Sequence, residues 1–150
     1  MDDEGLMRRA LAEAEHAASH GDVPVGALVV VEGEVIAARH NERQLTTDPT
    51  AHAEILAMRD ACAHLGTWRL DNATLVTTLE PCVMCAGALV NARIQRVVFG
   101  APDLEAGALG SVYNFGADPR LRHNFEISHN VLGDECAQRL KAFFASLRDR

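Results

Sequence analysis

The alternation of apolar and polar positions predicts helices and strands along the whole chain. Apolar residues recur at helical spacing over residues 4–19, which predicts an amphipathic helix. Two short apolar runs, 25–31 and 35–38, flank a turn and predict a β-hairpin. Because nearly every residue of these runs is apolar, we expect both faces of the sheet to be covered.

The rest of the chain alternates predicted strands with predicted helices. A polar loop over 41–49 leads into a helix over 51–65. The apolar stripe of this helix consists of Ile55, Met58, Cys62 and Leu65. The further predicted elements are a strand over 74–79, a helix over 82–92 with Pro81 at its first position, a strand over 94–99, a short strand over 125–127 and a helix over 134–148.

This order of elements predicts an α/β fold in a single domain spanning residues 1–150. A strand, a helix and a strand joined by short connections imply a parallel crossover, whereas the hairpin is antiparallel, so the sheet is mixed. We expect a three-layer α/β/α sandwich around a central mixed five-stranded sheet. Residues 100–124 contain many glycines and prolines and are expected to form a loop with one helical turn at most.

The composition agrees with a globular protein and limits the classes of partner that it is expected to bind. The hydrophobic fraction of 48% is enough for a core, and no apolar run reaches the length of about 18 residues that would span a bilayer. The acidic N-terminus lacks the basic and apolar segments of a secretory signal, so we expect a cytoplasmic protein. The net charge of −7 disfavours broad, sequence-blind adhesion to nucleic acid but leaves room for a local basic groove.

Two short motifs carry the candidate chemistry, and each stands where a predicted helix begins. They are His52-Ala53-Glu54 and Pro81-Cys82-Val83-Met84-Cys85. Cys82 and Cys85, three positions apart, can place two sulfurs on one ion, and His52 can supply a third ligand from another helix. Three protein ligands leave the fourth zinc position open for water, as in catalytic sites, so the pattern indicates a catalytic zinc centre.

Glu54 is the candidate proton carrier of this centre. In the middle of a helix His52 and Glu54 would point about 200° apart, and only the half-in geometry of a helix cap lets both face one cavity. Zinc held by two thiolates and a neutral imidazole is formally neutral, so its water should be less acidic than on an all-histidine site. A nearby carboxylate that takes the proton is therefore more necessary.

Other interpretations of the same residues remain open. A Cys-x-x-Cys pair by itself is also typical of a dithiol redox site. A structural zinc would need a fourth ligand, for which Cys62, Cys136 and His64 are candidates, although we expect both cysteines to be buried small hydrophobes. A non-catalytic binding module stabilised by zinc would keep the ligands without using Glu54.

Several longer segments, together with the two motifs, match a known family. They are residues 23–27, 48–54, 78–88 and 96–101, with 134–137 and 143–144 near the end. In these segments the chain resembles the bacterial tRNA-specific adenosine deaminases, zinc enzymes of the cytidine deaminase-like fold. The resemblance implies hydrolytic deamination of adenosine to inosine at the wobble position of an arginine tRNA, by a homodimer with one Zn²⁺ per subunit.

The resemblance also implies roles for individual residues. The implied zinc ligands are His52, Cys82 and Cys85, with Glu54 as the proton shuttle. The implied contacts to the base and the ribose are Asn41, Asp103 and the backbone N–H of Ala53. A deaminase of a free base or nucleoside, of the guanine or cytosine type, would use the same zinc site and is the alternative enzyme.

The implied partner is the tRNA anticodon stem-loop, and a local cationic rim is our hypothesis for how it binds. The rim residues are Arg120, Arg122, Arg139, Lys141 and Arg148. Phe143 or Phe144 is available to stack on a base, and the alternative is that both phenylalanines belong mostly to the core.

Overall fold

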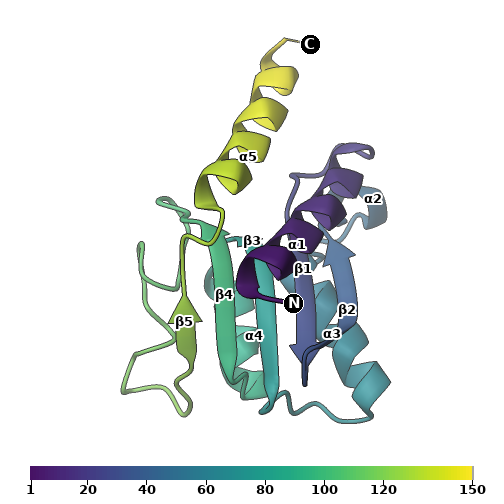
Figure 1. Cartoon of the computed structure of the whole chain (residues 1–150). Coiled ribbons are helices and arrows are strands. Elements are labelled where there is room, and N and C mark those ends of the chain that lie inside the picture. Colours follow the sequence, from purple (N-terminus) through teal and green to yellow (C-terminus); the bar gives the residue numbers. More distant parts are fainter. Residues whose placement is uncertain (150) are drawn as a thin grey trace.

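One sheet of five strands, in the order β2-β1-β3-β4-β5, forms the centre of the computed structural model, which describes residues 1–149 (Figure 1). The strands are β1 (Gly26–Val31), β2 (Glu34–His40), β3 (Ala73–Leu79), β4 (Arg96–Ala101) and β5 (Glu126–Ser128). β1 runs antiparallel to β2 and β3, whereas β4 runs parallel to both β3 and β5. The predicted hairpin, parallel crossover and mixed sheet are confirmed.

Helices cover both faces of this sheet. They are α1 (Asp3–Ala18), α2 (Arg43–Thr46), α3 (Ala53–Leu65), α4 (Val83–Ala92) and α5 (Gly133–Arg148). α1 and the start of α5 lie on one face, α3 and α4 lie on the other, and the outer part of α5 extends beyond the sheet (Figure 1). The predicted three-layer α/β/α sandwich is therefore confirmed.

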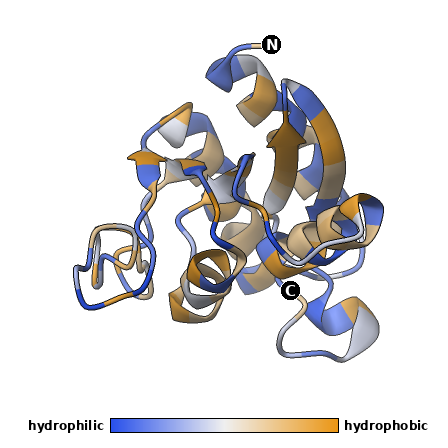
Figure 2. Cartoon of the chain, turned by 90° about the horizontal axis from the view of Figure 1, so that it is seen from below, coloured by the Kyte–Doolittle hydropathy of each residue, from blue (hydrophilic) through white to orange (hydrophobic). Residues whose placement is uncertain are grey.

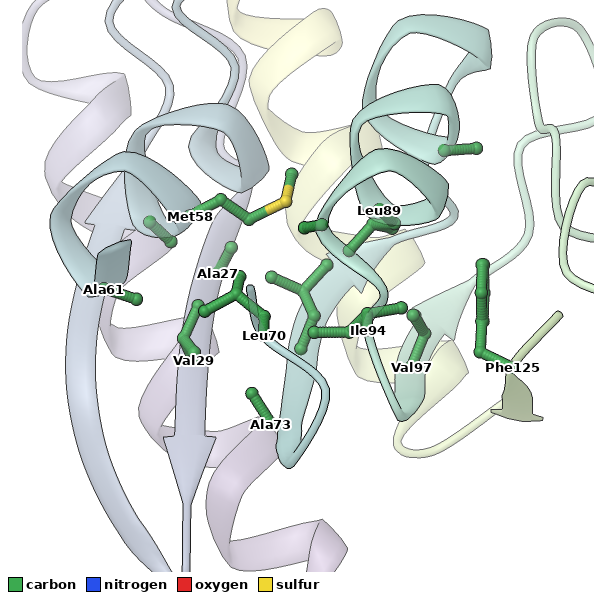
Figure 3. Close-up of a cluster of buried hydrophobic side chains, with 14 of the residues drawn as sticks. Ala27, Val29, Met58, Ala61, Leu70, Ala73, Leu89, Ile94, Val97 and Phe125 are labelled. Atoms are coloured by element: carbon green, nitrogen blue, oxygen red, sulfur yellow. The ribbon is translucent and has the colours of Figure 1, made fainter. Parts of the chain in front are cut away.

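The larger part of the core lies between the sheet and the pair α3 and α4. Met58 of α3 and Leu89 of α4 point toward the sheet, where Val29 and Val97 face them (Figure 3). Burying one such side chain contributes about 1.5–3 kcal/mol. Seen from below, the strands at the centre of the molecule carry hydrophobic residues, and many of the hydrophilic residues lie in the turns (Figure 2).

The opposite face of the sheet packs against α1 and the first turn of α5. Leu28, Val76 and Val98 are the strand residues of this second cluster, and Met7 and Cys136 are the buried partners from the two helices. Neighbours in one strand, such as Leu28 and Val29, thus serve opposite layers, as the two-residue period of a strand requires. Among residues 1–149, no helix combines the length and apolar character needed to cross a membrane.

The predicted apolar stripe of α3 coincides only in part with its core face, because Met58 alone of the four predicted residues is buried. The buried residues of α3 are Ala53, Glu54, Ala57, Met58 and Ala61, while Ile55 and Cys62 are only half-buried and Leu65 is exposed. Alanine side chains let the helix approach the sheet closely, so the bulkier residues turn toward the groove beside α4. The expectation of a fully buried Cys62 fails for the same reason.

Several predicted boundaries also change. Pro81 does not occupy the first position of α4, because the helix begins at Val83 and Cys82 is its N-cap. β4 starts two residues later than predicted, since Arg93 adopts a left-handed conformation that ends α4 and a turn follows. The short helix α2 lies in the predicted 41–49 loop, and residues 102–124 contain turns and one isolated bridge but no helix.

Candidate metal centre and active site

Three side chains from two helix starts meet at the metal centre. The ligand atoms of His52, Cys82 and Cys85 all lie within 4.8 Å of one another. His52 Nδ1 is 3.7 Å from Cys82 Sγ and 3.5 Å from Cys85 Sγ. The structure therefore brings together the three residues that the two motifs single out.

The helix caps explain how residues distant in sequence face one point. His52 is the N-cap of α3 and Cys82 is the N-cap of α4, both with extended backbone, and neither side chain makes a capping hydrogen bond. Both side chains are thus free to turn toward each other. The positive ends of two helix dipoles lie at the site and favour negative charge on the sulfurs.

The donor set fits zinc in type and spacing. Zinc takes thiolate sulfur at about 2.3 Å and imidazole nitrogen at about 2.0–2.1 Å, so a tetrahedral site separates nitrogen from sulfur by about 3.6 Å. The two separations from His52 Nδ1, 3.7 and 3.5 Å, match that edge. These residues are therefore suited to hold Zn²⁺ with one position left for a ligand from outside the protein.

The two cysteines differ in proton affinity. A hydrogen bond from the Cys85 thiol, and a further one from His52, lower the pKa of Cys82 to about 3. The pKa of Cys85 is raised because its proton is held by Cys82 and because the side chain is buried. The hydrogen bond to Cys82 raises the pKa of His52. The pair thus carries one thiolate, on Cys82, before a metal binds.

Glu54 faces the same cluster from the first turn of α3. Its side chain is buried, and its pKa is raised chiefly by that burial. The nearby His52 and a hydrogen bond with Cys85 oppose the rise. The cap position of His52 thus allows both motif residues to face the metal centre, and a carboxyl group of raised pKa is suited to carry a proton there.

Asn41 and Ala53 are joined to each other in this site. Asn41 Oδ1 accepts a hydrogen bond from the Ala53 N–H at 2.8 Å, and Asn41 Nδ2 donates to the Val23 carbonyl at 3.0 Å. The buried Asn41 therefore fixes the first residue of α3 directly after His52. The backbone donor expected at Ala53 is already engaged within the protein.

Asp103 lies in the loop that follows β4, half-exposed. Its carboxylate accepts hydrogen bonds from the backbone N–H groups of Glu105 and Ala106, both at 3.1 Å. Among residues 1–149 it makes no hydrogen bond with the metal ligands. The structure places it on a separate loop from the triad.

The candidate RNA contacts are dispersed. Phe143 is buried with 9% of its surface exposed, whereas its neighbour Phe144 is 44% exposed and meets it edge to face. The idea that both are core therefore holds for Phe143 alone. Arg122 is exposed. Of the other rim residues, Arg120 is ion-paired with Asp118 and Arg139 with Glu15.

The candidates for a fourth protein ligand lie elsewhere. In the described part of the chain, the only group of three or more potential ligands is His52, Cys82 and Cys85. Cys136 is buried in the cluster between the sheet and α1, and Cys62 and His64 lie near the end of α3. This arrangement disfavours a structural zinc with four protein ligands.

Glu80 is the residue that sequence reasoning missed. It is 2% exposed, and its carboxylate binds the backbone of the loop containing Asp103. The available signal was a charged residue between an apolar strand and the Pro-Cys motif, where burial demands partners.

Comparison with known proteins agrees with this geometry. The model of the MafB19-like deaminase family matches residues 1–148. The chain is 47% identical over 148 residues to the tRNA-specific adenosine deaminase of Bacillus subtilis, covering 99% of this chain and 92% of that protein. It is 44% identical over 149 residues to the protein of the same name from Aquifex aeolicus, covering 99% and 98%.

Solved structures show the same fold. One, from work on A-to-I editing by tRNA:A34 deaminases at the wobble position, superposes with a TM-score of 0.88 at 42% identity, covering 91% of this chain and 99% of that chain. A guanine deaminase from Nitrosomonas europaea superposes with a TM-score of 0.82 at 26% identity, covering 95% and 84%.

Proposed function

The chain belongs to the tRNA-specific adenosine deaminases, and from this membership we propose that it converts adenosine to inosine at wobble position 34 of an arginine tRNA. It is then a hydrolase, in which water replaces the exocyclic amino group at C6 of the purine and ammonia is released. The observation that carries the proposal is the triad of His52, Cys82 and Cys85 with the buried Glu54 beside it.

Each residue of the centre has a role in this reaction. His52, Cys82 and Cys85 would hold one Zn²⁺ per subunit. Bound zinc supplies a Lewis acid that activates water for attack on C6 of the purine. Glu54 takes the proton that water loses and gives protons to the ring and to the departing amine. Its raised pKa suits this exchange, since a carboxylate that binds a proton more tightly than usual is a better acceptor for the proton of water.

The substrate side of the site is built by residues outside the triad. We propose that Asn41 contacts the purine and the ribose while holding the start of α3, and that Asp103 contacts the ribose. The Ala53 N–H reaches the base only if Asn41 releases it, because the two are hydrogen-bonded at 2.8 Å. An anticodon loop suits such a site, since its bases are already partly unstacked and flipping one of them out of the loop costs little free energy. A tRNA substrate also supports a cytoplasmic location.

A second copy of the chain is the proposed partner of the groove between α3 and α4. This groove has a volume of about 330 Å³, and its apolar lining includes Ile55, Met58 and Trp68. Trp68 is 59% exposed, and Ile55 is only half-buried. Covering such a surface favours association. Light scattering tests this placement by the molar mass of the parent protein and of Trp68→Glu. A dimeric parent protein with a monomeric variant supports the groove as the dimer interface. A variant with the same mass as the parent protein excludes it.

An anticodon stem-loop with A or G at the wobble position tests the activity. We expect inosine from the A34 stem-loop and no reaction on free adenosine, guanine or cytidine. The guanine deaminase of the same fold makes a free-base substrate the specific alternative. Ammonia released from guanine or cytidine, with no inosine in RNA, would overturn the proposal in favour of that alternative.

A further inference from the structure

A second buried carboxylate, Glu80, lies between the end of β3 and the metal ligand Cys82. Its oxygens accept four hydrogen bonds from one loop. The donors are the backbone N–H groups of Asp103 at 3.1 Å, Leu109 at 2.9 Å and Ser111 at 3.1 Å, and the Ser111 hydroxyl. A buried carboxylate is stable only with such partners, and here all of them come from residues 103–111, which we name the clasp loop.

Two glycines allow the clasp loop to close on Glu80. A Cβ atom at Gly107 would lie 2.3 Å from the Glu80 carboxylate, closer than any side chain tolerates. Gly110 has a φ of 134°, which residues with a Cβ rarely adopt. The sequence of the loop is therefore fitted to the carboxylate that it surrounds.

Backbone hydrogen bonds join the same segments. The Glu80 N–H donates to the Ala101 carbonyl at 2.9 Å, and the Ala108 N–H donates to the Pro81 carbonyl at 2.8 Å. Pro81 is fully buried and directly precedes Cys82. The first bond holds Glu80 to the end of β4, and the second attaches the clasp loop to the residue before a metal ligand.

We propose that Glu80 is a positioning residue that holds the clasp loop, and with it Asp103, in the place where the RNA substrate is received. This inference rests on the proposed function, because it takes Asp103 as a substrate contact. The Asp103 N–H is bound to Glu80, while its carboxylate organises the next turn through Glu105 and Ala106. The hydrogen bond from its backbone N–H to Glu80 therefore helps to fix the position of Asp103.

Removing the negative charge should release the loop without dismantling the metal centre. In Glu80→Gln the side-chain amide offers one oxygen in place of two, and its NH₂ group faces donors that need an acceptor. Glu80 makes no hydrogen bond with His52, Cys82 or Cys85 among residues 1–149. Zinc binding should therefore survive while Asp103 loses its fixed position.

The test compares Glu80→Gln with Glu105→Gln, which removes the same charge from an exposed position of the same loop. Kinetics on the A34 stem-loop, zinc content and amide hydrogen exchange at Leu109 and Ser111 are measured for both. We expect Glu80→Gln to retain zinc, to raise KM at least about tenfold with a smaller change in kcat, and to exchange both amides faster. Glu105→Gln should stay within about twofold of the parent protein in KM, with unchanged exchange.

A double variant separates positioning from general destabilisation. If Glu80 acts through Asp103, Glu80→Gln combined with Asp103→Ala should raise KM no more than Asp103→Ala alone. Fully additive effects, or unchanged exchange at Leu109 and Ser111 in Glu80→Gln, would overturn the inference. Should Glu80→Gln fail to fold, Ser111→Ala against Ser111→Thr makes the same comparison, because threonine keeps the hydroxyl donor.

The positioning role of Glu80 and the proposed deaminase function can be disproved independently of each other. Hydrogen exchange is measured without substrate, so it decides whether Glu80 holds the loop even if the parent protein does not deaminate the stem-loop. A parent protein that does not deaminate the stem-loop would overturn the proposed function, and with it the role of Glu80 in receiving RNA. Faster exchange together with an unchanged KM would overturn the role in receiving RNA while leaving the deaminase activity in place.

Discussion

At the starts of α3 and α4 the reactive side chains are half-buried or buried and face one another. Along α5 and the turn over residues 118–124, by contrast, the candidate RNA contacts are dispersed and, except for Phe143, exposed. Nδ1 of His52 lies within 3.7 Å of both cysteine sulfurs. Phe144 and Arg122, by contrast, project into solvent. We call these the metal end and the RNA-facing end.

The two regions place different requirements on the sequence. The metal end needs fixed distances of a few ångströms, so its residues belong to short motifs at helix caps, where the backbone determines direction. The proposed RNA-facing end would meet a large, charged partner, which long side chains from several elements can contact. Variants should therefore have sharp effects at the metal end and graded effects at the RNA-facing end.

The largest expected effect is that of His52→Ala. Loss of the imidazole leaves two sulfurs on the metal, so we expect zinc to be lost, inosine formation to become undetectable and thermal stability to fall, because metal binding and folding are linked. Metal analysis and a stem-loop assay measure these changes. His64→Ala, an exposed histidine on the same helix, is the matched control and should behave as the parent protein. Full zinc occupancy in His52→Ala would contradict the ligand assignment.

The thiols should differ strongly in reactivity. In zinc-free protein Cys82, with a pKa of about 3, is a thiolate at pH 7. Burial raises the pKa of Cys136 to about 11, so that thiol stays protonated. We expect alkylation of Cys82 to be at least about 100-fold faster, as judged by mass spectrometry of peptides. Zinc should protect Cys82 and leave the slow rate of Cys136 unchanged, and equal rates in the zinc-free protein would count against this electrostatic picture.

The two adjacent phenylalanines should separate folding from RNA binding. Phe143→Ala empties a buried position and should lower the free energy of unfolding by about 2–4 kcal/mol, whereas Phe144→Ala should lower it by less than about 1 kcal/mol. If Phe144 stacks on a base, its loss should weaken stem-loop binding about fivefold or more. Urea unfolding and a binding titration measure the two quantities. A reversed order of stabilities would show that the roles are exchanged.

The smallest expected effect is that of Arg122→Ala. An exposed arginine that contacts a phosphate should raise KM for the stem-loop by about two- to tenfold and reduce the salt dependence of binding by about one phosphate contact. Arg120→Ala is the comparison within the same rim, because its guanidinium is ion-paired with Asp118, and we expect it to have the smaller effect. An unchanged KM and salt dependence in Arg122→Ala would remove Arg122 from the proposed rim.

Much of the fold could be predicted from the sequence because buried positions recur along it at the period of a helix or of a strand. The strand over 25–31 is predicted from an apolar run and the strand over 74–79 from its β-branched residues, and their counterparts in the structure match within one residue. The core face of α3 could not be predicted from side-chain size. Ala57 and Ala61 pack inward because small residues allow close approach, which a stripe of larger residues such as Ile55 conceals.

The metal ligands could be predicted because each of the two motifs is short and its residue types are those that bind zinc, whereas the loop contacts could not. The partners of Glu80 lie more than twenty positions further along the chain, at Asp103, Leu109 and Ser111, in a segment without a motif. The hydrogen bond between Asn41 and Ala53, which engages the donor expected to meet the base, could not be predicted either. Such contacts depend on tertiary folding, which spacing along the sequence does not encode.

Turnover and zinc content of Glu54→Gln, measured on one preparation, test the central claim most directly. Glutamine keeps the shape of the side chain but cannot carry a proton. We expect the parent amount of zinc, with inosine formation in the A34 stem-loop lowered about 10²–10⁴-fold. Turnover close to that of the parent protein, with zinc still bound, would contradict the assignment of Glu54 as the proton carrier.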